Sequence, residues 1–106
     1  VFDADHLRRY TLGDEALERE LLELFRVQAR LHLDLIAAAA CAGDFNASVH
    51  ALKGAALGMG ATDIAETTAK LEAVNFKADP VKRQRLVERL RMQVAAAEAA
   101  IARKAG

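Results

Sequence analysis

Apolar residues recur every three or four positions along most of the chain, and this period predicts helices. The longest such pattern begins at Glu15, and its roughly 25 residues would span roughly 38 Å as a helix. We expect a near-heptad stripe of this helix to face the core, formed by Leu17, Leu21, Leu24, Gln28, Leu31 and Leu35. Four further apolar residues widen the stripe: Leu22, Phe25, Ala29 and Ile36. So broad an apolar face predicts a central helix of a bundle.

Capping and helix-ending residues divide the whole pattern into five helices. We expect these over about residues 4–10, 14–40, 45–59, 63–76 and 80–103. The main boundaries are Gly43-Asp44, then Gly60 with Thr62 or Asp63 as the next N-cap, and last Asp79-Pro80. Short connections favour antiparallel neighbours. The predicted fold is therefore all-α: an antiparallel up-down-up-down four-helix bundle with a short extra N-terminal helix, in one domain over residues 1–106.

Composition and charge narrow the class of protein. A chain of 106 residues is long enough to bury one core without disulfides, and the single Cys41 fits a reducing compartment. Nothing resembles a signal peptide, and no apolar run approaches the roughly 20 residues of a membrane-spanning helix. With 15 basic and 15 acidic residues, no tryptophan and one tyrosine, the chain lacks the features of a nucleic-acid-binding protein. We expect a cytoplasmic monomer that binds neither membrane nor nucleic acid.

The predicted helix around residues 48–60 has two different faces. Its core stripe comprises Phe45, Val49, Leu52, Ala56 and Met59, and its other face presents His50, Lys53, Gly54 and Leu57, with Gly58 at the edge. Each glycine inside a helix costs about 1 kcal/mol relative to alanine. A phosphoryl-accepting histidine needs a neutral ring nitrogen, a nearby cation and room for a partner, and this face offers all three.

Other chemistries lack their usual sequence features. The chain has no histidine, cysteine or carboxylate cluster at metal-ligand spacing, so we expect no metal site. It has no phosphate-binding glycine loop and no G-x-S-x-G segment. We therefore expect no bound cofactor, no ATP site and no autokinase activity.

The segment His50-Ala51-Leu52-Lys53-Gly54, with Gly60 ten residues after the histidine, resembles the H-x-L-K-G-(x)5-G pattern of histidine-containing phosphotransfer (HPt) domains. The resemblance covers nearly the whole chain. It implies a four-helix bundle that takes a phosphoryl group from the phospho-aspartate of one receiver domain and passes it to another. The receivers would belong to response regulators and hybrid histidine kinases, and magnesium would be bound by the receiver.

The resemblance also implies roles for single residues. His50 would be the phosphorylated residue, Lys53 its electrostatic partner, and Gly54 the position that gives the receiver access. Apart from the resemblance, we expect Ala47 and Leu57 to be exposed beside the bare glycine backbone and to complete the docking face, with Gly58 near its edge.

Two questions stay open at the level of sequence. Glu72 stands where several HPt domains have glutamine, and it could either orient the His50 imidazole or be an ordinary surface charge that pairs with Lys53. The alternative function is a non-catalytic helical docking module that binds a signalling partner through the His50 face. A third interpretation is a helical piece of a kinase dimerisation bundle, which joins two chains. The four long helices of this one chain argue against it, because they already complete a bundle.

Overall fold

The computed structural model describes residues 2–105, and in this range it contains five α-helices and no β-strand. The helices are α1 (Ala4–Thr11), α2 (Glu15–Ala38), α3 (Ala42–Met59), α4 (Thr62–Glu72) and α5 (Pro80–Ala105). The predicted all-α class is confirmed. No helix in the described part of the chain is long and apolar enough to span a membrane.

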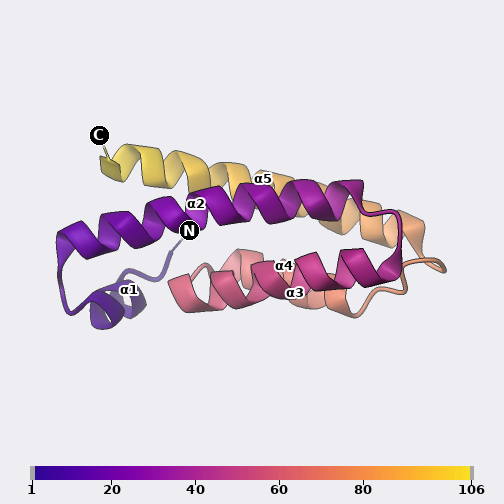
Figure 1. Cartoon of the computed structure of the whole chain (residues 1–106), viewed down its shortest axis with the longest axis horizontal. Helices are drawn as coiled ribbons and strands as arrows, with labels where there is room; N and C mark the ends of the chain where they lie inside the picture. The colour runs from indigo at the N-terminus through magenta and orange to yellow at the C-terminus, as the bar shows by residue number, and fades with distance from the viewer. Residues whose placement is uncertain (1, 106) are drawn as a thin grey trace.

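The four longer helices enclose one core. α2 packs against α3 and α5, and α4 packs against the same two helices. In Figure 1, α2 and α5 form the upper layer and α3 and α4 the lower one, in a molecule of 45 × 22 × 17 Å. The colour gradient shows that each of these helices runs opposite to the one before it (Figure 1). α1 lies at the end of the bundle where α2 begins and α3 ends.

The predicted core stripe of α3 is confirmed, and it fixes how this helix is rotated. Phe45, Val49, Leu52 and Ala56 are completely buried. α4 and α5 bury residues in the same core: Ile64, Thr68, Leu71, Leu86, Leu90, Val94, Ala97 and Ile101. Burial stabilises by about 1.5–3 kcal/mol for each large apolar side chain. Rotating α3 would expose its stripe, so this energy keeps the opposite face of the helix in solvent.

The prediction for the core face of α2 was wrong for its main stripe and is confirmed for the four residues that widen it: Leu22, Phe25, Ala29 and Ile36. Its buried residues are Leu22, Phe25, Ala29, Leu33 and Ile36. The predicted stripe lies mainly on the surface: Leu17, Leu24, Gln28, Leu31 and Leu35 are exposed, and Leu21 is half-buried. Both stripes have spacings of three and four residues, so the helical period fits either one. The placement of α3 and α5 against α2 decides which stripe is buried.

Two helix starts also differ from the prediction. α3 begins at Ala42, and Cys41 occupies its N-cap position without a side-chain cap bond. Gly43 and Asp44 therefore belong to the first turn, where the helix dipole favours the Asp44 carboxylate. The N-cap position of α4 is Ala61, so neither Thr62 nor Asp63 occupies it.

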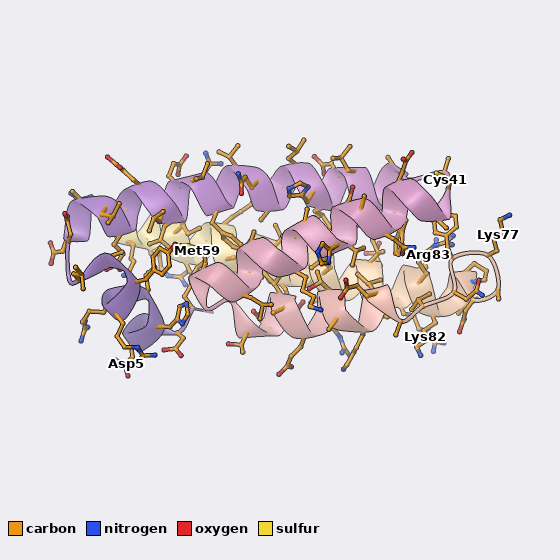
Figure 2. The ribbon with its side chains drawn as sticks, turned by 60° about the horizontal axis from the view of Figure 1, so that its bottom comes forward. Asp5, Cys41, Met59, Lys77, Lys82 and Arg83 are labelled. Atoms are coloured by element: carbon orange, nitrogen blue, oxygen red, sulfur yellow. The ribbon has the colours of Figure 1, made fainter. Side chains whose placement is uncertain are left out.

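The loop after α4 begins earlier than predicted. α4 ends at Glu72, and in the loop that follows, Asn75 Oδ1 accepts hydrogen bonds from the backbone N–H groups of Lys77 (3.1 Å) and Ala78 (3.0 Å). Such side-chain bonds compete with the helical pattern. α5 begins at Pro80 as predicted, and Asp79 accepts a hydrogen bond from the Lys82 N–H at 3.2 Å. Figure 2 places Lys77 and Arg83 at the same end of the bundle as Cys41, away from α1.

Gly60 ends α3 as predicted. Its φ of +69° is left-handed, a conformation that glycine adopts without the steric cost of a Cβ. The next N–H, that of Ala61, donates to the Ala56 carbonyl at 2.9 Å, which is the hydrogen bond of a Schellman turn. The phosphoacceptor candidate His50 therefore lies in a helix with a well-defined C-terminus.

Candidate functional site

Three side chains from α3 and α4 meet on the surface of the bundle. Nδ1 of His50 lies 3.1 Å from Oε2 of Glu72. The Lys53 ammonium donates to the other carboxylate oxygen, Oε1, at 2.7 Å. The His50 side chain is 79% exposed, against 33% for Lys53 and 29% for Glu72. The imidazole thus projects into solvent while the other two side chains pack at its base.

Two neighbouring helices bring these residues together. Lys53 follows His50 by three positions, so the two share one face of α3. Glu72 is the last residue of α4, directly after the completely buried Leu71. Because Leu71 fixes the rotation of α4, the next side chain reaches across to α3.

The hydrogen bond to Glu72 defines the state of the imidazole. A carboxylate can only accept, so Nδ1 of His50 carries the proton. In the neutral ring, Nε2 then keeps its lone pair. The Lys53 ammonium and, secondly, the His50 ring lower the pKa of Glu72 by hydrogen bonding, so this carboxylate stays ionised at neutral pH. The site therefore holds a ring with a nucleophilic nitrogen directed away from the carboxylate.

Two glycines leave bare backbone on the exposed side of α3. A Cβ at Gly54 or at Gly58 would meet no other part of the chain within 4 Å. The packing of this domain therefore does not require glycine at either position. Each of the two glycines nevertheless destabilises the helix by about 1 kcal/mol relative to alanine. Gly54 lies one turn from His50.

A shallow groove runs beside these glycines, between α2 and α3. Its α2 wall comprises Leu21, Leu24, Phe25 and Gln28, its α3 wall comprises Gly54, Ala55, Gly58 and Met59, and Tyr10 of α1 joins them. Of the four predicted docking residues, Gly54 and Gly58 line this groove, whereas Ala47 and Leu57 are exposed outside it.

Sequence reasoning missed the α2 wall. Leu24 belongs to the stripe that the sequence predicts as core, yet its side chain is 53% exposed. The sequence signal was present as a second apolar stripe on α2, but its direction depends on the neighbouring helices.

No group of three or more histidine, cysteine or carboxylate side chains is placed to bind a metal within residues 2–105. In particular, the His50 site pairs its single carboxylate with an ammonium group.

The Hpt domain family matches residues 20–100, a segment that includes all of α3 and α4. The chain belongs to the Hpt domain family. Hpt domains carry out phosphotransfer in two-component signalling and interact with receiver domains in phosphorelays. No curated protein and no solved structure matches the chain. α1 precedes the matched segment.

Proposed function

We propose that this Hpt domain is a phosphorelay intermediate. Its His50 takes a phosphoryl group from the phospho-aspartate of one receiver and passes it to another receiver. The main support is the hydrogen bond between His50 Nδ1 and Glu72, which leaves Nε2 exposed as the nucleophile. An up-down-up-down bundle would hold this ring on a rigid helix, and one chain supplies all the helices needed, so we infer that a monomer is active.

The transfer step follows from this geometry. The Nε2 lone pair attacks the phosphorus atom in line with the bond to the aspartyl oxygen. The N–P bond forms as the P–O bond breaks, and the electron pair leaves on the receiver's carboxylate. The imidazole ring gains positive charge, and the Glu72 carboxylate stabilises that charge through the Nδ1–H bond. In the onward step, a second receiver's aspartate attacks phosphorus and the N–P electron pair returns to Nε2.

The charge of the phosphoryl group requires cations on both partners. On this chain, Lys53 lies one turn from His50 and would attract the phosphoryl oxygens. On the other side, we propose that magnesium bound by the receiver supplies the remaining positive charge. This chain would then need no cofactor of its own.

The docking surface is the α3 face around Gly54 together with the groove beside it. Bare backbone at Gly54 would let the receiver's active site approach Nε2, and the apolar wall with Leu24 would pack against the receiver's surface. Leu57, which is 55% exposed, adds apolar area on the same helix.

The test uses receiver domains from the same genome, each phosphorylated with radioactive phosphate. We expect a cognate receiver to transfer label to the domain, and the label to be stable to base and labile to acid. His50→Gln should abolish labelling, whereas His32→Gln on α2 should label normally. Equal labelling of His50→Gln and the wild type would contradict the proposal. Binding of a receiver without any transfer to the wild type would instead support the alternative, a docking module without chemistry.

A further inference from the structure

Two hydrogen bonds tie α1 to the C-terminal turn of α3. The Asp3 backbone N–H donates to the Gly60 carbonyl at 2.9 Å, and His6 Nε2 lies 3.0 Å from the Gly58 carbonyl oxygen. A carbonyl can only accept, so His6 Nε2 carries a proton and donates it. Figure 2 shows α1, marked by Asp5, beside the end of α3, marked by Met59.

The His6 bond satisfies one further carbonyl at the end of the phosphoacceptor helix. The last four carbonyls of a helix have no partner inside it. The N–H groups after α3 bond the carbonyls of Ala56 and Leu57, and His6 bonds that of Gly58. Because glycine is a poor helix former, a bond from outside the helix should limit fraying of this turn.

The start of α1 packs closely against Gly60. A Cβ at Gly60 would lie 3.0 Å from the Asp3 Cβ and 3.3 Å from the Asp3 nitrogen. Glycine is therefore required here twice, once by its positive φ and once by the approach of α1. This contact between Asp3 and Gly60 fixes the position of α1 relative to α3.

Tyr10 of α1 lines the shallow groove between α2 and α3. It follows His6 by four positions, so both residues lie on one face of α1. Its side chain lines the groove together with Gly54 and Gly58, yet the residue is 66% exposed. Tyrosine offers a large apolar ring and a hydroxyl group, and it is enriched among the residues that dominate binding energy.

We propose that α1 belongs to the receiver-recognition surface: Tyr10 contacts the docked receiver and strengthens its binding, and His6 is a positioning residue that holds α1 through Gly58. The proposal rests on the proposed function and extends it to a helix that precedes the family match.

The test compares variants of the whole domain in receiver binding and in transfer kinetics. Tyr10→Ala should raise both the Kd for the receiver and the KM for transfer by about tenfold, with kcat unchanged at saturation. Arg9→Ala, at the neighbouring exposed position of α1, is the matched control and should change neither. His6→Ala should raise KM, and His6→Gln should restore it, because the glutamine amide can donate to the Gly58 carbonyl. A loss of packing alone would not be rescued in this way.

The results separate this proposal from the proposed function. Equal Kd and KM values for Tyr10→Ala, Arg9→Ala and the wild type would overturn the role of α1 while leaving transfer through His50 intact. A wild type that binds a receiver but acquires no phosphoryl group would overturn the proposed function, and the Kd values of the same variants would still test α1. If His6→Ala unfolds, shown by circular dichroism, Tyr10→Ala decides the outcome alone.

Discussion

The carboxylate of Glu72 accepts a hydrogen bond from Nδ1 of His50 at 3.1 Å, although the two residues are twenty-two positions apart. This contact joins the end of α4 to the exposed face of α3. It assigns Nδ1 as the protonated nitrogen and leaves Nε2 for chemistry. Glu72 also accepts a hydrogen bond from Lys53, so a single carboxylate contacts both the His50 imidazole and the nearby ammonium group.

Removing this acceptor should slow phosphotransfer. We expect Glu72→Ala to lower the transfer rate about tenfold, the effect of a loss of 1.4 kcal/mol in transition-state stabilisation. Glu72→Gln keeps an oxygen acceptor for Nδ1–H and should retain most of the rate. Rapid-quench measurements with a labelled receiver would show the difference, and Glu66→Gln, an exposed position of α4, is the control. Equal rates for the alanine variant and the wild type would mean that Glu72 does not orient the ring.

The stability that Glu72 contributes should depend on pH in one direction. Bonds from Lys53 and then His50 lower its pKa from the ordinary value of 4.5, so near that pH the unfolded chain binds more protons than the folded one. The contribution is therefore complete above about pH 4.5 and is lost as the pH falls through the lower, folded pKa. It should be at most about 1 kcal/mol, since the group is at the surface.

Urea denaturation of the wild type and Glu72→Gln between pH 3 and pH 7 would test this dependence. The free energy of unfolding should differ most at neutral pH, and the two curves should converge in acid. A difference that stays constant over the whole range would contradict the assignment. Added salt should reduce the difference at neutral pH, because the interacting groups are partly exposed.

Gly54→Ala should separate stability from function. Apart from the adjacent backbone of α3 itself, no atom lies within 4 Å of the added methyl group, and alanine is the better helix former, so the free energy of unfolding should rise by about 1 kcal/mol. Transfer should nevertheless become slower, because the methyl group would lie where we propose that the receiver approaches. Gly43→Ala is the control: this position also lies in α3 with open space around it. A stabilised Gly54→Ala domain with an unchanged transfer rate would exclude steric access as the role of Gly54.

Two leucines of α2 should respond very differently to truncation. Leu33 is completely buried, so Leu33→Ala should destabilise the domain by about 2–5 kcal/mol. Leu31 is 53% exposed, and Leu31→Ala should change stability by less than about 0.5 kcal/mol. Thermal and urea unfolding of the two variants would measure this contrast. Similar losses at both positions would indicate that the exposed stripe of α2 is covered in solution.

The sequence by itself determined much of the local structure and part of the chemistry. Helical periodicity and the Gly60 and Asp79-Pro80 boundaries follow from residue properties within a few positions. The buried stripe of α3 does so too, and it directs His50, Lys53 and Gly54 away from the core. Such features are local, because a helix fixes the relative directions of residues three or four apart.

Only the tertiary structure decided which stripe of α2 is buried and which partners the distant residues have. Two stripes of equal period compete for the core, and the positions of α3 and α5 select the one with Leu33. The bond of His50 to Glu72 and that of His6 to Gly58 join residues 22 and 52 positions apart. Contacts at such separations depend on how whole helices pack, and the helical period contains no information about that packing.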